Sequence, residues 1–134
     1  MGQKSIKRLI LAAGLLLAAT ACGEADKAIT KQDGMTLIHT AEIENGIIGF
    51  NGPTPVVIYL RKNQVVRVEM SANQETPRYN EKVRKALSRA WDGQSLQDAA
   101  TLEVDAVSGA TYTSVAVIEN VRLGLNYYLA KKKK

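Results

Sequence analysis

Residues 105–114 (DAVSGATYTS) place an acid, small residues and hydroxyl groups at the expected start of a helix. Gly109 and Ala110 carry little side chain, so a ligand can approach the backbone closely at this turn. A helix start exposes unpaired N–H groups and the positive end of the helix dipole, and both favour a phosphate. Capping needs only one hydroxyl, so the excess predicts a phosphate site. The serine and threonine hydroxyls are those of Ser108, Thr111, Thr113 and Ser114.

Three other chemistries lack the residues that they need. The turn contains no lysine and no GxxxxGK sequence followed by Ser or Thr, which excludes a loop for nucleoside triphosphates. His39 is the sole histidine and has no spaced set of Cys, His or carboxylate residues around it, so we predict no metal site. No pair of nucleophile and base supports hydrolysis, and we therefore expect no catalytic residues.

The same ten residues resemble the flavinylation motif of the FMN-binding domain family, which includes flavoprotein subunits of sodium-pumping NADH:quinone oxidoreductases. The motif is an acid, two residues, Ser or Thr, Gly-Ala-Thr and, after one variable residue, Thr-Ser. Residues 105–114 meet every fixed position. The resemblance implies FMN as the cofactor, attached through its phosphate to Thr111 by an extracytoplasmic FMN transferase that uses FAD and magnesium. Thr113 is the second choice of acceptor.

The resemblance also suggests roles for the rest of the motif. Residues 108–110 are small and leave space for the cofactor to reach Thr111, and Thr113 or Ser114 caps the helix. Asp105 is not expected to touch the phosphate, because two anions repel each other. Two roles for Asp105 stay open: a cap or turn partner that holds the loop, and recognition by the transferase with its magnesium.

Two elements upstream extend the resemblance to nearly the whole domain. Residues 75–77 (Glu-Thr-Pro) are similar to a family element near the flavin, so Glu75 and Thr76 are predicted to contact the cofactor. An exposed acid before a helix start is the alternative for Glu75. Residues 52–55 (Gly-Pro-Thr-Pro) resemble the family's glycine-containing start of a strand. Tyr112 either stacks on the isoalloxazine ring or faces solvent.

The hydrophobic pattern predicts an α+β fold, an antiparallel sheet packed with two main helices on one face. Period-two alternation with turn signals predicts the strands, and apolar stripes at helical spacing predict the helices. Thr76 is the expected N-cap of the first main helix and Pro77 its first residue. The expected strands are 36–44, 47–50, 56–60, 65–70 and 102–107, and the expected helices are 77–91, 114–129 and one turn at 96–100.

The chain begins with the pattern of a lipoprotein signal peptide. Three basic residues precede a short apolar stretch, residues 9–19, which ends in small residues. The stretch is too short for a membrane-spanning helix, which needs about 20 apolar residues. Residues 19–22 (Ala-Thr-Ala-Cys) resemble a bacterial lipobox, with Ala where Leu is usual, and imply cleavage before Cys22 and lipid attachment to its sulfur. An ordinary signal peptide with an incidental cysteine is the alternative.

Composition divides the chain into four parts. Residues 1–21 are the expected signal peptide, 22–34 a polar tether, 35–130 a single FMN-binding domain and 131–134 a basic tail. The formal charge of the whole chain is +5, but the signal peptide supplies three basic residues and the tail four. Without both ends the net charge is −2 with mixed signs, which predicts no basic face and no nucleic-acid partner.

Together these features predict a lipid-anchored, extracytoplasmic electron carrier with covalent FMN and no substrate-turnover site of its own. It would contact the membrane through its lipid and exchange electrons with unidentified redox partners. Two alternatives stay open. The domain could bind FMN or another phosphorylated ligand without a covalent bond, or it could be a cofactor-free lipoprotein for interaction or assembly.

Overall fold

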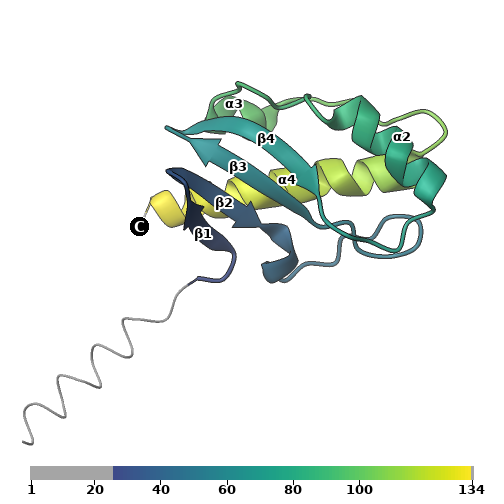
Figure 1. The fold of residues 1–134 in the computed structure, drawn as a ribbon, viewed down its shortest axis with the longest axis horizontal. Helices are drawn as coiled ribbons and strands as arrows, with labels where there is room; N and C mark the ends of the chain where they lie inside the picture. The colour runs from purple at the N-terminus through teal and green to yellow at the C-terminus, as the bar shows by residue number, and fades with distance from the viewer. Residues whose placement is uncertain (1–25, 134) are drawn as a thin grey trace, which may run out of the picture.

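Four antiparallel strands form one sheet in the computed structural model, which describes residues 26–133 (Figure 1). The strands are neighbours in sequence order: β1 (Ile29–Gln32), β2 (Met35–His39), β3 (Val56–Arg61) and β4 (Gln64–Met70). A 3-10 turn, η1 (Thr40–Glu42), follows β2, and helices follow the sheet: α2 (Pro77–Leu87), α3 (Leu96–Thr101) and α4 (Thr111–Lys132). The predicted α+β class is confirmed.

Two tight hairpins set the register of the sheet. The β1–β2 turn uses Asp33 (φ 52°) and Gly34 (φ 76°), and the β3–β4 turn uses Lys62 (φ 51°) and Asn63 (φ 62°). Two central residues with positive φ form a turn whose twist matches that of the paired strands. The hairpins therefore bring the apolar residues of successive strands onto a common face.

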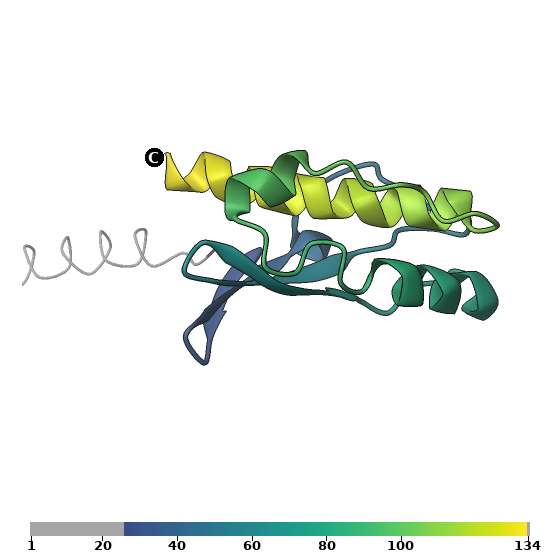
Figure 2. The same ribbon diagram turned by 90° about the horizontal axis from the view of Figure 1, so that it is seen from above.

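Helix α4 lies across one face of the sheet (Figure 2). In β3, Val56, Ile58 and Leu60 are buried, and in α4 Val121 and Leu125 are fully buried in the same core cluster. Full burial of one such side chain stabilises the fold by roughly 1.5–3 kcal/mol. The packing of α4 therefore fixes where its first turn lies relative to the sheet.

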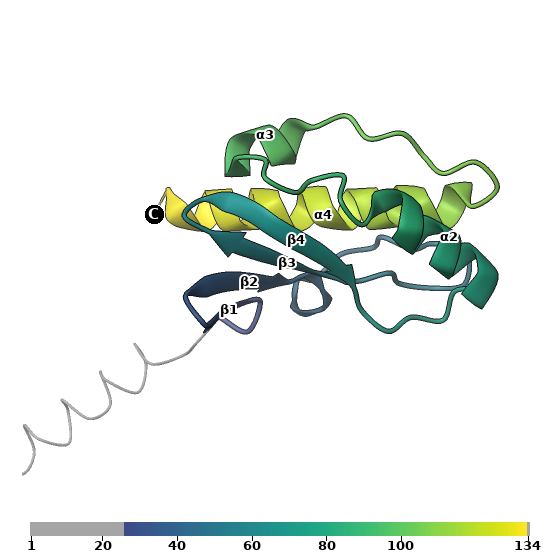
Figure 3. The same cartoon turned by 45° about the horizontal axis from the view of Figure 1, so that its top comes forward.

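The two shorter helices flank opposite halves of α4 (Figure 3). Helix α2 begins at Pro77 as predicted, ends at Leu87 instead of 91, and lies beside the N-terminal half of α4. Helix α3 begins after Ser95, whose hydroxyl accepts a hydrogen bond from the Asp98 N–H (3.1 Å), and packs on the C-terminal half. This arrangement brings α2 next to the start of α4.

The sheet begins earlier than the sequence suggested. β1 lies inside residues 22–34, expected as a tether, because its two-residue turn pairs it with β2. The strand expected over 36–44 ends at His39, where η1 begins, and residues 47–50 form a loop instead of a strand. Polar, mixed composition therefore does not exclude an edge strand that has a suitable turn.

Residues 102–107 are extended but pair with no strand in the part of the chain that the structure describes, so the expected last strand is wrong. Leu102 and Val104 are half-buried and pack against the core. Arg122 of α4 donates from Nη2 to the Leu102 carbonyl oxygen (3.2 Å). Alternate side chains of this segment are half-buried because they contact the helices. This contact gives the same period-two pattern as burial in a sheet.

The N-terminal end of the described chain is bonded to α4. The Tyr127 hydroxyl donates to Asp26 Oδ2 (2.7 Å), and Lys131 Nζ lies 3.5 Å from the same oxygen. The hydrogen bond between Tyr127 and Asp26 lowers the pKa of Asp26 and raises the pKa of Tyr127. The predicted signal peptide and Cys22 lie outside the described residues. Within residues 26–133, no helix combines the length and the apolar character needed to cross a membrane.

Candidate functional site

Thr111 is the first residue of α4, three positions earlier than expected, and its side chain is exposed, as is that of Ser108. Thr113 and Ser114 are buried, with 1% and 0% exposure. Neither caps the helix, because Ala110 occupies the N-cap position without a side-chain hydrogen bond. The hydroxyls of the motif are thus divided between solvent and the protein interior.

The Ser114 hydroxyl closes the turn from within. The Val107 N–H donates to Ser114 Oγ (2.9 Å), and the hydroxyl donates to the Thr111 carbonyl oxygen (3.0 Å). The Ala110 N–H also donates to the Val107 carbonyl oxygen (2.9 Å). The predicted capping role is therefore wrong for Ser114, which instead holds the loop in front of the helix.

The first turn of α4 keeps backbone donors available. Within the described chain, the N–H groups of Thr111, Tyr112 and Thr113 have no acceptor, whereas the Ser114 N–H donates to the Ala110 carbonyl oxygen (2.9 Å). Free N–H groups at the start of a 22-residue helix carry the positive end of its dipole and attract an anion. The anion site predicted from the sequence therefore has its backbone donors.

A lysine from α2 lies beside the turn. Gly109 has a φ of +83°, and a Cβ added to it would lie 2.8 Å from Lys82 Nζ. The glycine thus supplies a left-handed backbone conformation and leaves room for the ammonium group. The motif itself contains no lysine, and only the folded chain brings Lys82 of α2 to this turn. Its position adds a positive charge next to the free N–H groups.

Glu75 is buried, with 5% exposure, and joins three segments of the chain. Its Oε1 accepts hydrogen bonds from the Phe50 N–H (2.6 Å) and the Thr113 hydroxyl (2.7 Å), and its Oε2 accepts one from the Asn51 N–H (2.5 Å). The alternative of an exposed acid is therefore wrong. Glu75 connects the loop before β3 and the approach to α2 with the first turn of α4.

Two further contacts support this loop. A Cβ added to Gly49 would collide with Glu75 Oε1, so the glycine permits the close approach of carboxylate and backbone. Asn51 donates from Nδ2 to Thr76 Oγ1 (3.3 Å). Thr76 occupies the N-cap position of α2 as predicted but makes no capping hydrogen bond with its side chain. The Thr76 hydroxyl thus supports the 49–52 loop.

Aromatic side chains surround the exposed hydroxyl of Thr111. A cavity of about 260 Å³ is lined by Phe50, Tyr79, Tyr112 and residues 109–113. Phe50 is 58% and Tyr112 70% exposed, and the Phe50 ring centroid lies 6.3 Å from those of both Tyr79 and Tyr112. Exposed flat rings next to an anion site suit a ligand that combines a planar aromatic system with a phosphate.

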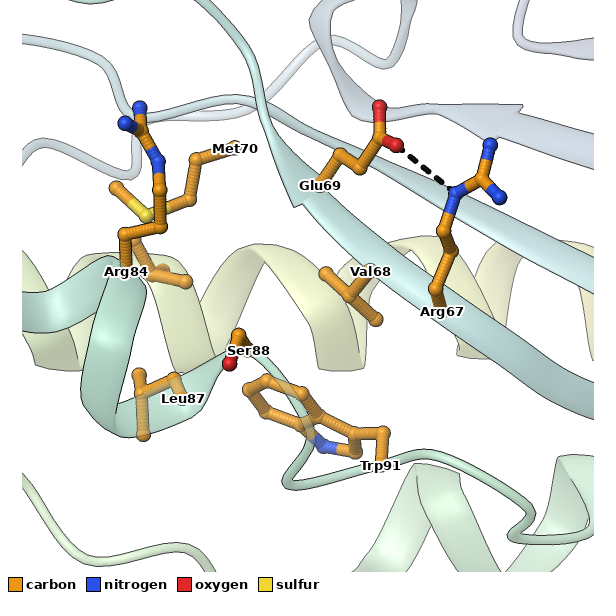
Figure 4. A pocket seen from close by; sticks show the side chains of 9 residues that line it. Arg67, Val68, Glu69, Met70, Arg84, Leu87, Ser88 and Trp91 are labelled. Carbon is orange, nitrogen blue, oxygen red and sulfur yellow. Dashed lines mark ion pairs between the residues drawn. The ribbon is translucent and has the colours of Figure 1, made fainter.

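A larger cavity, about 460 Å³, lies between β4 and α2 and contains none of the motif residues (Figure 4). Its floor is apolar, with Trp91, Leu87 and Val68 among the residues that line it. At its rim, Arg67 Nε lies 2.8 Å from Glu69 Oε1, so this charge is already neutralised. The free N–H groups of α4 do not line this cavity. The cavity therefore does not match a phosphate site.

A family model described as the FMN-binding domain matches residues 49–126. The chain belongs to the FMN-binding domain family. The match includes the three elements that carry the resemblance in the sequence, residues 52–55, 75–77 and 105–114. No curated protein matches the chain. FMN is therefore the cofactor of this domain.

The residues at the start of α4 fit FMN. The free N–H groups of residues 111–113 and the Lys82 ammonium group suit its phosphate. The rings of Phe50, Tyr79 and Tyr112 suit the isoalloxazine system. Phe50, Tyr79 and Lys82 were not among the predicted site residues, because only the folded chain brings them to the motif.

Two predicted site residues have surroundings that limit their roles. Glu75 has its two oxygens occupied by protein donors, so its carboxylate shapes the site and is not free for the cofactor. Asp105 is exposed and has no hydrogen bond or ion pair with any described residue. The predicted role of Asp105 in holding the loop therefore has no contact to support it, and recognition by an FMN transferase stays a prediction.

Proposed function

We propose that the protein carries FMN covalently, as a phosphoester on Thr111, and works as an electron carrier without a substrate of its own. The observation that carries this proposal is the contrast between the two candidate acceptors. Thr111 is exposed at the free N–H groups of α4. Thr113 is buried, and its hydroxyl is bonded to Glu75. Only the first is accessible to a modifying enzyme.

An FMN transferase would attach the cofactor with FAD as the donor. The Thr111 oxygen forms a bond to the phosphorus of the FMN half, the bond between the two phosphates of FAD breaks, AMP leaves, and the threonine proton is released. The modified residue keeps its place in the turn, because the 108–114 loop is closed by the Ser114 hydroxyl and not by Thr111. Asp105, exposed near the acceptor, is available to the transferase and its magnesium.

Bound FMN supplies one- and two-electron chemistry, and the protein supplies its position. The free N–H groups of α4 and Lys82 hold the phosphate, and the exposed aromatic side chains of Phe50 and Tyr112 line the cavity beside it. A covalent bond would also prevent loss of the cofactor outside the cytoplasm. We propose this location, with a lipid on Cys22, from the signal sequence.

A lipid on Cys22 would also orient the domain. Cys22 lies four positions before Asp26, so the anchor would lie within about 14 Å of Asp26. Asp26 is bonded to Tyr127, near the C-terminal end of α4, whereas Thr111 is at its other end. A 22-residue helix is about 33 Å long. The flavin would therefore lie on the end of the domain that points away from the membrane.

Expression with and without an FMN transferase tests the proposal. In a denaturing gel, the wild-type band is expected to fluoresce only when the transferase is present, and Thr111→Ala to lose this fluorescence. Thr101→Ala, at an exposed threonine of α3, is the matched control and should keep it. Flavin that copurifies but is released on denaturation would replace the covalent proposal by the non-covalent alternative. A protein without flavin in either host would contradict both.

A further inference from the structure

A row of exposed cations lies along α2, although the sequence predicted no basic face. Arg78, Lys82, Lys85 and Arg89, here called the basic stripe, follow one another at intervals of four, three and four residues. All four side chains are exposed, and none forms an ion pair with a described residue. Arg84, on a neighbouring face, does have a partner, Glu81 (3.2 Å).

The charge of this segment differs in sign from the rest of the domain. Residues 78–89 contain five basic residues and one acid, a net charge of +4. The other residues between 26 and 133 contain nine basic and eleven acidic side chains, a net charge of −2. The net charge of the whole chain therefore hides a local positive surface on α2. This surface becomes apparent only when the charges of α2 are counted separately.

The stability of α2 does not explain these charges. Like charges three or four residues apart on a helix repel each other and destabilise it. Arg78 also lies in the first turn, where the helix dipole disfavours a cation, and this turn contains no acid. Lys85 lies in the last turn, where the dipole favours a cation, but neither Arg78 nor the repulsion along the stripe is explained by helix stability.

The basic stripe begins at the cofactor site. Lys82 Nζ lies beside Gly109, and Tyr79, the neighbour of Arg78, lines the FMN cavity. From there the stripe continues along α2 to Arg89, just beyond the end of the helix at Leu87. A molecule that covers the stripe would therefore also lie next to the flavin.

We infer that the basic stripe is the docking surface for an acidic redox protein that exchanges electrons with the bound FMN. This inference rests on the proposed electron-carrier function. Complementary charge accelerates the encounter of two proteins and orients them, without the large apolar interface that would slow their separation. A protein partner fits better than anionic lipid, because a lipid on Cys22 would lie near Asp26, at the opposite end of α4.

Stopped-flow reduction of the flavinylated protein by a small acidic iron–sulfur protein tests the inference. Two reduced iron–sulfur proteins each give up one electron, and the FMN takes up both electrons with protons from water. The stripe variant is Lys85→Glu/Arg89→Glu, which leaves the residues next to the cofactor unchanged. The control is Lys27→Glu/Lys133→Glu, two exposed lysines with the same change in net charge.

At about 0.01 M ionic strength, where the Debye length is about 30 Å, the stripe variant is expected to be reduced about tenfold more slowly than wild type. The control variant should be affected much less, and both differences should shrink in high salt. Cytochrome c, a basic electron acceptor, should react faster with the stripe variant than with wild type. Equal rate constants for the stripe and control variants would overturn the docking surface.

Two further measurements separate the remaining explanations. The extent of reduction by excess dithionite should be the same in all variants; if FMN is absent or is not reduced, the electron-carrier function itself fails. If dithionite reduces every variant but the acidic protein does not distinguish them, only the docking surface fails. Sedimentation with phosphatidylglycerol vesicles should show no dependence on the stripe. Vesicle binding that the stripe variant loses and the control keeps would assign this surface to a membrane and overturn the protein partner.

Discussion

The Thr113 hydroxyl donates a hydrogen bond to Glu75 Oε1 over 2.7 Å, although the two residues are 38 positions apart in the chain. The same carboxylate accepts the N–H groups of Phe50 and Asn51. One buried side chain thus fixes the loop that carries an aromatic residue of the cavity and the helix that carries Thr111. The pair gives the Thr113 hydroxyl of the motif a structural role.

Glu75→Gln should destabilise the domain. The amide keeps one acceptor oxygen but turns an NH₂ group toward a partly buried backbone donor, and the unsatisfied groups cost roughly 1–3 kcal/mol. Urea unfolding of the unmodified protein measures the loss. Glu81→Gln, at an exposed ion pair with Arg84, should change stability by less than about 1 kcal/mol. Similar losses for the two variants would contradict the buried role of Glu75.

Gly109→Ala should impair the turn and the modification together. An L-residue at a φ of +83° is strained by about 1–2 kcal/mol, and the new Cβ would press on Lys82 Nζ. Thermal unfolding and the yield of flavin fluorescence in a denaturing gel measure the two effects. Gly46→Ala is the matched control, because Gly46 has no positive φ and no atom within 4 Å of an added Cβ. Unchanged flavin yield in Gly109→Ala would contradict the proposed approach to Thr111.

Lys82→Gln should slow flavin attachment by roughly tenfold, the effect of losing one charge-assisted hydrogen bond of about 1.5 kcal/mol. The rate of fluorescence gain with purified transferase and FAD measures it. Lys85→Gln removes the same charge one turn further along α2, away from Gly109, and should have a much smaller effect. Equal rates for the two variants would show that Lys82 does not contact the phosphate.

Tyr127→Phe should flatten the pH dependence of stability on the acid side. The hydrogen bond lowers the pKa of Asp26, so its contribution is present above about pH 4 and is lost as the pH falls through the lowered value. It also raises the pKa of Tyr127, so that contribution is present below about pH 10 and is lost at higher pH. Urea midpoints between pH 2 and 7 measure the effect, which we expect to stay below about 1 kcal/mol.

The control for this change is Tyr128→Phe, since the Tyr128 hydroxyl has no hydrogen bond with a described residue. Its urea midpoints should follow the wild-type curve. If Tyr127→Phe also follows that curve, the hydrogen bond to Asp26 does not contribute to stability in solution.

The sequence predicted those parts of the structure that depend on neighbouring residues. The start of α2 at Pro77 and the turn between β3 and β4 follow from local preferences. The strand expected at 102–107 failed because its alternating pattern reports burial, and burial against helices gives the same pattern as burial in a sheet. β1 was missed because its composition is polar and its stabilisation comes from pairing with β2.

The site was predictable where the motif is continuous and unpredictable where it is not. Thr111 and Gly109 were found from their order in one turn. Phe50, Tyr79 and Lys82 reach that turn only through the folding of β3, β4 and α2, and no local pattern marks them. Glu75 was identified by the resemblance, but its burial and its hydrogen bond to Thr113 of α4 arise only in the folded chain.

The proposed function depends on a covalent bond between FMN and Thr111. Intact and peptide mass spectrometry of protein from a host with the transferase would detect this bond. We predict that the wild-type chain gains the mass of FMN less one water, that fragmentation places this mass on Thr111, and that Thr111→Ala gains none. The same added mass on Thr113, or its absence from the wild-type protein while FMN is bound, would contradict covalent attachment at Thr111.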